Sequence, residues 1–560
     1  MRISRVLSLF LTIVLLASLF SACTSGEKKK TANSGKSEAP SLDISQYSIT
    51  RPDNNDGNIR TIVSALKNSI LKHTEANLSV NLDKDSPELS DKYEILIGNT
   101  SRPESTSLLS ELSAKTKSNA FAIKITDKKI VIVGLSIDDT VIGVAHFINE
   151  LVETSSKKNS ISAEIGYTLL KKTGKLLYLS DKGDAVVLEK EVDIAKPTSV
   201  FDDSVYSGAN VIKLEHSDES NGTILVVSVG DSEYPFFRSD DDGKTWKKLP
   251  SIRDEFQNQL GGWQPDLYEL PAAMGRFPKG TLVFASCIRG PWDHTVSTHS
   301  TTNILVQTSN DLGMTWKNAQ YIDSAGHYDS GNYFFDSNAL WEPVLMYEES
   351  TKRLYCFYSD ETDPNHNQKL VYKYTTDLET WSEKKDMIAP ADKELRAGMV
   401  ALTRMGDGRW ALAYEMFNHR TGEYKGEIMI TYADSLDSWD PQNIGTIVKS
   451  SAGHVPANAP GMIWTPNGGE YGTLFVSHCY LLDGKASGSS VLFMSFDYGK
   501  TFHAIDNPIP TIRSTSTALS HLGYSSGFYV DSDGTVYYTS NQESMKGVNQ
   551  KLTFTKIKVY

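Results

Sequence analysis

Two glutamates stand in segments whose other residues are apolar enough to be buried. Glu342 lies within NALWEPVLM (338–346) and Glu415 within WALAYEMF (410–417). Burying a carboxylate without partners costs several kcal/mol, so both positions call for an explanation. Two carboxyl groups that face one cleft can cleave a glycosidic bond, because one protonates the leaving oxygen while the other attacks or stabilises the anomeric carbon.

The competing interpretation of these glutamates is structural. Either one could be a core partner of an arginine such as Arg289 or Arg396. If both are catalytic, their separation would decide the stereochemistry, since retaining enzymes hold the carboxyl groups about 5–5.5 Å apart and inverting enzymes roughly 6.5–9.5 Å apart. The sequence leaves this separation open.

An internal repeat indicates which elements position the glutamates. The segments 239–246, 309–316 and 495–502 fit the pattern S-x-D-x-G-x-T-W/F, and degenerate copies lie at 375–381 and 432–439. In this pattern the Asp and Ser/Thr side chains cap a tight hairpin, Gly takes a positive φ, and the aromatic residue packs between neighbouring sheets. The repeat is therefore structural, and its spacing predicts one copy per four-stranded blade.

The remaining texture of residues 174–560 is all-β, with short aromatic and β-branched strands between Gly, Asp and Asn turns. The repeat resembles the Asp box of sialidases. With a sixth blade closed by the C-terminal strands around 527–559, we predict a six-bladed, sialidase-like β-propeller as the catalytic domain. Because blades present their innermost strands to a central channel, we expect Glu342 and Glu415 on innermost strands about one blade apart, facing the same mouth.

A small α/β domain is predicted before the propeller, over residues 42–172, because strands alternate with helices there. It resembles the domain that precedes the catalytic domain in hexosaminidases and α-glucuronidases. We expect an accessory or packing role, with carbohydrate contact as the alternative. The predicted helices are 58–73, 105–117 and 138–154, and the predicted strands are 93–98, 120–126 and 129–134.

The N-terminus is typical of an exported, lipid-anchored protein. Residues 1–22 combine a short basic start with an apolar run, which predicts a signal peptide rather than a membrane span. LFSAC (19–23) resembles a bacterial lipobox with Cys23 as the lipidated residue, and the polar segment 23–41 would be a flexible tether. A plain signal peptide is the alternative. We expect the protein on the extracellular face of the bacterial cell membrane, held there through its lipid alone.

Composition excludes several classes of partner. The formal net charge is −13 and the isoelectric point is near 5.5, so nucleic acid is not an expected partner and a neutral ligand fits better. Neither CxxC nor HExxH occurs, and we predict no metal and no organic cofactor. Cys287, Cys356 and Cys479 are interpreted as small buried hydrophobic residues. We expect a monomer.

Four segments together resemble glycoside hydrolase family 93; they span 263–290, 339–361, 396–417 and 454–478. The resemblance implies a retaining exo-α-1,5-L-arabinanase on a six-bladed propeller, with an oligosaccharide or polysaccharide as its substrate and two catalytic glutamates. The W-E-P and Y-E segments of this chain match those that surround the catalytic glutamates of the family.

On that basis we predict that Glu342 and Glu415 are the catalytic residues. Trp341 and Pro343 should desolvate Glu342 and raise its pKa, which favours Glu342 as acid/base and Glu415 as nucleophile. Other candidates are stacking tryptophans, polar groups that orient hydroxyls or carboxylates, and rim residues, although core packing or a loop position would explain each of them equally well. They are Trp263 and Trp341, then Asp266, Arg289, Asp336 and Arg396, then His454 and Tyr524.

Two other functions remain open from the sequence. An exo-α-sialidase would need an arginine triad that begins on the first blade, but no arginine occurs between Lys172 and Phe237. The nearest similar segment, GRFP (275–278), follows the first repeat copy. The other alternative is a non-catalytic glycan-binding propeller at the cell surface, which would need neither glutamate.

Overall fold

The computed structural model describes most of the chain beyond the N-terminal segment. No helix among these residues combines the length and the apolar character needed to cross a membrane. The predicted signal peptide, Cys23 and most of the tether lie outside the described residues. The described residues are 40–560 without 54–55, 117–119, 156, 173–175, 180–184, 188–191, 202–208, 231–232, 254–261, 290–299, 329–337, 419–425, 451–452, 483–490, 511–522, 525 and 544–549.

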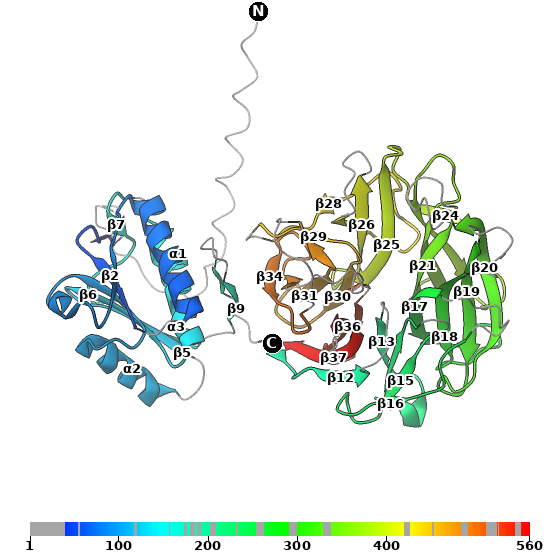
Figure 1. Cartoon of the computed structure of the whole chain (residues 1–560), viewed down its shortest axis with the longest axis horizontal. Helices are drawn as coiled ribbons and strands as arrows, with labels where there is room; N and C mark the ends of the chain where they lie inside the picture. Colours follow the sequence, from blue (N-terminus) through cyan, green and yellow to red (C-terminus); the bar gives the residue numbers. More distant parts are fainter. Residues whose placement is uncertain are drawn as a thin grey trace, which may run out of the picture. The chain divides into compact units, whose positions relative to one another are not determined.

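The N-terminal domain is built on one mixed sheet with the strand order β3-β2-β4-β6-β5-β8 (Figure 1). Strands β2, β3, β4 and β6 are parallel, whereas β5 is antiparallel to both β6 and β8. The short pair β1–β7 lies outside this sheet. The strands are β1 (Leu42–Asp43), β2 (Ser48–Arg51), β3 (Val80–Leu82), β4 (Glu94–Ile97), β5 (Ala120–Ile125), β6 (Lys129–Gly134), β7 (Ser160–Ile161) and β8 (Thr168–Lys172).

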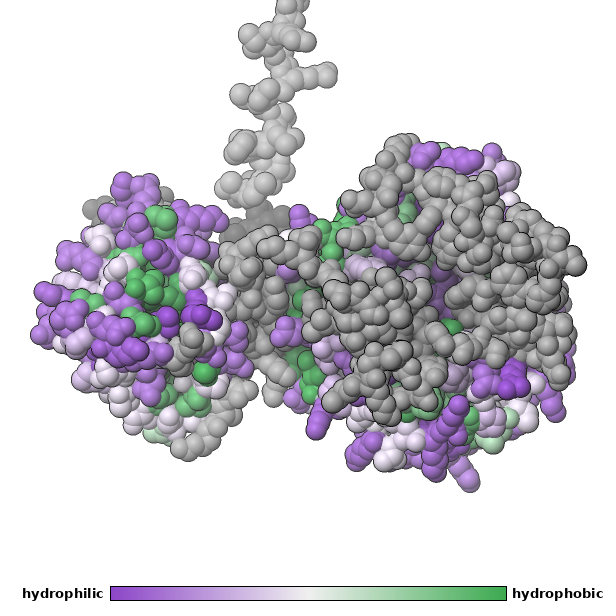
Figure 2. Space-filling model, viewed as in Figure 1, coloured by the Kyte–Doolittle hydropathy of each residue, from purple (hydrophilic) through white to green (hydrophobic). Residues whose placement is uncertain are grey.

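Helices cover both faces of this sheet. The helices α1 (Gly57–Thr74) and α3 (Ile137–Phe147) share one hydrophobic core, to which β4 contributes Ile95 and Ile97. The helix α2 (Pro103–Lys115) packs in a second core, to which β4 contributes the intervening Leu96. Alternate strand residues thus face opposite layers, as expected of a buried parallel strand. Hydrophilic side chains cover most of the visible face of the domain in Figure 2.

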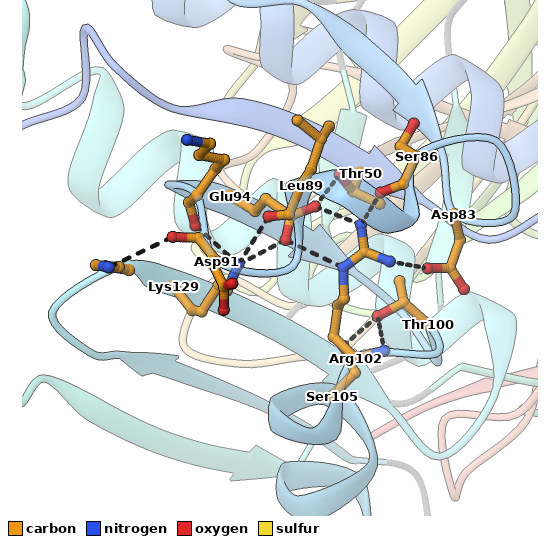
Figure 3. A network of polar contacts seen from close by, with 12 residues as sticks. Thr50, Asp83, Ser86, Leu89, Asp91, Glu94, Thr100, Arg102, Ser105 and Lys129 are labelled. Atoms are coloured by element: carbon orange, nitrogen blue, oxygen red, sulfur yellow. Dashed lines mark hydrogen bonds and ion pairs between the residues drawn. The ribbon is translucent and has the colours of Figure 1, made fainter.

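A buried charge cluster ties this domain together (Figure 3). Glu94 is fully buried at the start of β4 and accepts hydrogen bonds from Thr50, Arg102 and Lys129. Arg102 also pairs with Asp83, at 2.9 Å. Burial alone would raise the pKa of Glu94, but the hydrogen bonds from Arg102, Lys129 and Thr50 hold it below its usual range. The cluster is a partnered structural network.

The second domain is a six-bladed β-propeller, which confirms the predicted fold class (Figure 1). The innermost strands of the blades contact one another in the order β13, β17, β21, β25, β30, β35, and β35 returns to β13 to close the ring. The blades, from the innermost strand outward, are β13 (Ala209–Lys213), β14 (Ile224–Ser228), β15 (Phe236–Ser239) and β16 (Lys247–Lys248); β17 (Gly262–Glu269), β18 (Leu282–Arg289), β19 (Ser300–Ser309) and β20 (Lys317–Tyr328); β21 (Leu340–Glu348), β22 (Arg353–Asp360), β23 (Lys369–Thr375) and β24 (Lys385–Ile388); β25 (Leu395–Arg404), β26 (Trp410–Asn418), β27 (Glu427–Ala433) and β28 (Thr446–Ile447); β30 (Gly461–Thr465), β31 (Thr473–Ser477), β33 (Val491–Ser495) and β34 (His503–Asp506); β35 (Gly527–Val530), β36 (Val536–Glu543) and β37 (Gln550–Val559).

The sixth blade takes its outer strands from the other end of the propeller sequence. The strands β11 (Val192–Ile194) and β12 (Thr198–Phe201) both pair antiparallel with β37. We predicted closure by the C-terminal strands, and the structure adds that these N-terminal strands complete the sheet. The preceding strands β9 (Leu176–Leu179) and β10 (Ala185–Val187) pair with each other.

The repeated turns have the predicted hydrogen bonds. In the second blade Ser309 Oγ donates to Asp311 Oδ1 and accepts from the Gly313 amide, and the Thr315 hydroxyl donates to Asp311 Oδ2. Gly313 has a φ of 84°, and a Cβ there would lie 2.3 Å from the Phe236 ring of the preceding blade. Glycine is therefore required for both conformation and packing.

Residues 432–439 contain a turn that differs from the predicted degenerate copy. The third position of the repeat falls on Asp434 in this copy, but the structure pairs Ser435 Oγ with Asp437 Oδ1 instead. This Ser-x-Asp pair lies three residues further along the chain than the repeat pattern places it. The three cysteines beyond the N-terminal segment, Cys287, Cys356 and Cys479, are free and buried, as predicted.

Candidate active site

Four successive blades carry a non-glycine residue with a left-handed backbone in the innermost strand or just before it. The residues are Gln264, Glu342, Met399 and Ala459, with φ between 43° and 59°. The first three lie where strand pairing shifts register in β17, β21 and β25, and Ala459 comes just before β30. Such conformations cost of order 1–3 kcal/mol each and concentrate at functional sites.

The Glu342 side chain lies at the wall of the central channel. A bulge of Glu342 and Pro343 interrupts the pairing of β21 with β22, and the Ser359 hydroxyl on β22 donates to Glu342 Oε2 at 3.1 Å. The Glu342 side chain is half-buried: part of it lines the cavity, and protein encloses the rest. Burial, followed by the negative charge of Glu415, raises the pKa of Glu342 to about 8. This carboxyl is suited to hold a proton near neutral pH.

The second carboxyl group, that of Glu415, belongs to β26, which corrects our expectation that it lies on an innermost strand. It reaches toward the centre because its partner on the innermost strand is Gly398; a Cβ there would lie 3.2 Å from Glu415 Oε1. The Ala459 amide donates to Glu415 Oε2 at 2.8 Å. Burial raises the pKa of Glu415 to about 7, opposed by this hydrogen bond and by the charge of Arg396.

One contact chain joins the two glutamates. The Met399 amide donates to Ser359 Oγ, which donates to Glu342, and Met399 follows Gly398, against which Glu415 packs. The left-handed residues Met399 and Ala459 thus each supply an amide to this site. Glu342 and Glu415 come from neighbouring blades, and the charge of Glu415 raises the pKa of Glu342. The two carboxyl groups therefore lie close enough to interact, as two groups that face one cleft must.

Arg396 and Glu361 form a buried ion pair beside the two glutamates. Arg396 Nη2 donates to Glu361 Oε1 at 2.7 Å, and the guanidinium faces the Phe417 ring. Its positive charge lowers the pKa of both Glu342 and Glu415, but burial outweighs it. The structural alternative, in which Arg396 simply neutralises these glutamates, does not fit, because Arg396 forms an ion pair with Glu361. The side chain of Arg289, the other arginine considered, lies outside the described residues.

A cavity of about 340 Å³ occupies the propeller centre and is lined by all six innermost strands. This volume lies within the usual range for small-molecule sites. Glu342 contributes to its wall, whereas Glu415 is set back behind Gly398. Among the described residues that line the cavity there is no lysine or arginine, and the acidic ones are Asp266, Glu269 and Glu342.

Asp266, predicted as a polar group that orients the substrate, lies in the cavity wall. Its oxygens accept hydrogen bonds from the Asn210 amide and the Leu345 backbone amide, which links three blades. Burial raises its pKa to about 7. Its contacts position neighbouring strands as well as the cavity surface.

The other predicted binding residues are scattered. Trp341 is 3% exposed and packs in a hydrophobic core, because the bulge directs Glu342 rather than Trp341 toward the channel; this position does not favour the predicted sugar stacking. Tyr524 packs beside Met399 and Ala459, near the glutamates. His454 is half-buried and does not line the cavity. Asp336 and the side chains of Trp263 and Arg289 lie outside the described residues.

Sequence reasoning missed several residues of the site. Their roles depend on neighbours that are known only once the strand pairing is known. Ser359, for example, hydrogen-bonds Glu342 from the adjacent strand, and Gly398 leaves space for the side chain of Glu415. One signal was available: Trp263-Gln264-Pro265 and Trp341-Glu342-Pro343 repeat a W-x-P pattern at the start of two innermost strands. The missed residues are Gln264, Ser359, Glu361, Gly398 and Met399.

Comparison with solved structures finds matches that include an arabinanase and an arabinofuranosidase from two fungi. The α-L-arabinanase of Penicillium chrysogenum, complexed with arabinobiose, matches with a TM-score of 0.53 and 25% identity over 65% of this chain and 98% of that chain. The family 93 α-L-arabinofuranosidase of Fusarium graminearum, also with arabinobiose, matches with a TM-score of 0.53 and 26% identity over the same shares. No family model and no curated protein sequence matches the chain. The resemblance to family 93 is thus confirmed as a structural likeness.

Proposed function

We propose that the chain is a glycoside hydrolase that releases short sugars from the end of an α-L-arabinan or a related glycan. The observation that carries this proposal is the pair Glu342 and Glu415, a half-buried and a buried carboxyl from neighbouring blades beside one cavity, both with raised pKa. Raised carboxyl pKa values at a cavity are typical of catalytic acids and bases. The likeness to the two fungal enzymes supports a glycosidase.

Glu342 is the acid/base in this proposal. Its pKa of about 8 keeps the carboxyl protonated at neutral pH, so it can give its proton to the leaving glycosidic oxygen. Its ionised form can then take a proton from the water that hydrolyses the intermediate. Ser359 holds Oε2, which orients the group for both steps.

Glu415 is the nucleophile. Its pKa of about 7 and the Ala459 amide leave it ionised once the pH exceeds 7, and attack on the anomeric carbon forms a glycosyl ester as the leaving oxygen is protonated. Water then cleaves that ester, with net retention. Both groups are in the required state between about pH 7 and pH 8, where kcat/KM should be highest.

A neutral sugar fits the cavity better than a sialic acid. A sialoside carries a carboxylate, and no lysine or arginine occurs among the described residues of the cavity wall to pair with it. Burying a carboxylate without such a partner is costly, which disfavours a sialoside as substrate. The exo-α-sialidase therefore remains the weaker alternative, and a non-catalytic glycan-binding propeller is the other one.

The test is hydrolysis by the purified protein of linear arabinan, debranched arabinan and sialyl-lactose, with the anomeric product followed by NMR. We expect release from arabinan with retention. Glu342→Gln and Glu415→Gln should each lower kcat by roughly a thousandfold or more, because each removes a proton-transfer or nucleophilic step. Their melting temperatures should stay close to that of the wild-type protein.

The surface variant Glu379→Gln is the matched control, since it makes the same change in a carboxylate paired with Arg276. It should retain wild-type activity. Wild-type turnover in Glu342→Gln or Glu415→Gln would remove these residues from the mechanism. Retardation on arabinan without any hydrolysis would favour the binding propeller, and turnover of sialyl-lactose alone would favour the sialidase.

We also propose that the mature protein is anchored on the extracellular face of the cell membrane through Cys23. The support is the sequence of residues 1–23, with its apolar run and its small residues before the cysteine. Mass spectrometry of the N-terminal peptide from the membrane fraction should find a diacylglyceryl-modified Cys23. An unmodified Cys23, or a protein found only in the medium, would contradict the anchor.

A further inference from the structure

Gln264 occupies the same position in the second blade that Glu342 occupies in the third blade, because each is the middle residue of a W-x-P segment. Both residues precede a proline, both have a left-handed φ, 43° and 59°, and both form the bulge that shifts the register of an innermost strand. A residue before proline prefers an extended backbone, so the same unfavourable conformation has arisen twice. The two side chains are therefore presented in equivalent ways by adjacent blades.

The contacts of Gln264 connect it to the catalytic pair. Gln264 lines the cavity and is 8% exposed, and its Nε2 lies 3.8 Å from Met399 Sδ. The Met399 amide in turn bonds Ser359, the partner of Glu342. A side-chain amide has two N–H donors and a carbonyl oxygen acceptor, so Gln264 can contact Met399 and also hydrogen-bond a sugar hydroxyl. The group is thus buried and next to the reacting position.

We propose that Gln264 is a substrate-positioning residue that hydrogen-bonds hydroxyl groups of the sugar bound beside Glu342. An amide has both donors and an acceptor without net charge, which suits a pair of neutral hydroxyls. A charged residue at this position would add to the carboxylates already present. This role rests on the proposed function and extends it, since it makes the blade adjacent to the catalytic pair a determinant of sugar recognition.

Binding to an inactive parent separates this role from catalysis. Calorimetric titration of α-1,5-arabinotriose into Glu415→Gln is compared with the same titration into Glu415→Gln with Gln264→Met. Methionine keeps the length of the side chain but removes both hydrogen-bonding groups, and the loss of two hydrogen bonds should weaken binding roughly tenfold to hundredfold. In the active background Gln264→Met should raise KM more than it lowers kcat.

Two further variants control for structural effects. Gln442→Met makes the same change at a glutamine whose amide bonds Ala389 O in an outer loop, and it should leave affinity unchanged. Should Gln264→Met not fold, Gln264→Asn keeps the amide and tolerates the left-handed backbone better, while drawing the amide back by one methylene. It too should weaken arabinotriose binding.

The outcomes distinguish the two proposals. Equal affinities of the Glu415→Gln parent and its Gln264→Met derivative would overturn the role of Gln264 and leave the proposed function standing. Absence of arabinotriose binding to the folded parent would overturn the proposed sugar, and the role of Gln264 with it. An affinity loss in Gln264→Met, with an unchanged melting temperature, supports the role.

Discussion

The α/β domain and the propeller both bury a glutamate at a strand, and the two glutamates differ in what surrounds them. Glu94 receives hydrogen bonds from Arg102, Lys129 and Thr50 (Figure 3), and its pKa falls below its usual range. Glu415 receives one backbone amide and the more distant influence of Arg396, and its pKa rises to about 7. Burial alone does not distinguish them, because Glu94 is 0% and Glu415 3% exposed.

The difference between these two sites is one of compensation. In the α/β domain two cations offset the cost of burying Glu94 and Asp83, so the charges stabilise one arrangement of β4, β6 and α2. In the propeller Arg396 is engaged with Glu361, and Glu342 and Glu415 keep only partial compensation. Incomplete compensation near a cavity is typical of catalytic carboxyls, whereas complete compensation is typical of structural ones.

The largest expected change in stability comes from Glu94→Gln, which removes the charge of the fully compensated glutamate. The change leaves Lys129, whose side chain is 4% exposed, without its carboxylate partner, and breaking a buried ion pair costs about 3–5 kcal/mol. Hydrogen exchange of the full-length protein should become faster in β4 and β6 and stay unchanged in the propeller. Hydrolysis of arabinan should continue at the wild-type rate wherever the domain remains folded.

Two comparisons sharpen the Glu94 experiment. Adding Lys129→Met to Glu94→Gln removes the orphaned charge and should recover part of the lost stability. Glu111→Gln, at a surface ion pair with Lys115, should change exchange very little. If β4 and β6 exchange as slowly in Glu94→Gln as in the wild-type protein, the charge cluster does not stabilise this domain. The contrast between a structural Glu94 and a partly compensated Glu415 would then be wrong.

Much of this fold follows from local sequence, since the hairpin turns depend on residues such as Ser309, Asp311 and Gly313 that contact one another directly. The predicted strands 120–126 and 129–134 agree with β5 and β6 within one residue. The pairing of β11 with β37 was not predictable, because it joins segments at opposite ends of the propeller and no local pattern marks it.

The site was predictable in part for the same reason. A charged residue in an apolar run marked Glu342 and Glu415 as candidates without any knowledge of pairing, and the structure brings the two side chains together beside the cavity. The importance of Gly398 appears only when its partner across the strands is known, since the missing side chain matters for the space it leaves to Glu415. The rotation of Trp341 away from the channel likewise depends on a bulge that the sequence signalled only through a repeated proline.

An effect of opposite sign in the two regions is expected from pH. The folded propeller holds protons on Glu415 and Asp266 up to about pH 7, and on Glu342 up to about pH 8, whereas the unfolded chain releases them near pH 4. Their contribution to stability is complete below that pH and is lost as the pH rises to 8. The slope can reach about 1.4 kcal/mol per pH unit for each group.

Glu94 titrates the other way, because its folded pKa is lowered: its contribution is present above the unfolded pKa and is lost as the pH falls through the folded value. Scanning calorimetry between pH 5 and 8 should show the propeller transition moving to lower temperature as the pH rises. The double variant Glu342→Gln with Glu415→Gln should make that dependence shallower, since a neutral amide does not titrate and only Asp266 of the three groups remains. A dependence equally steep in the double variant would show that other groups carry it, and that the two glutamates are as fully compensated as Glu94.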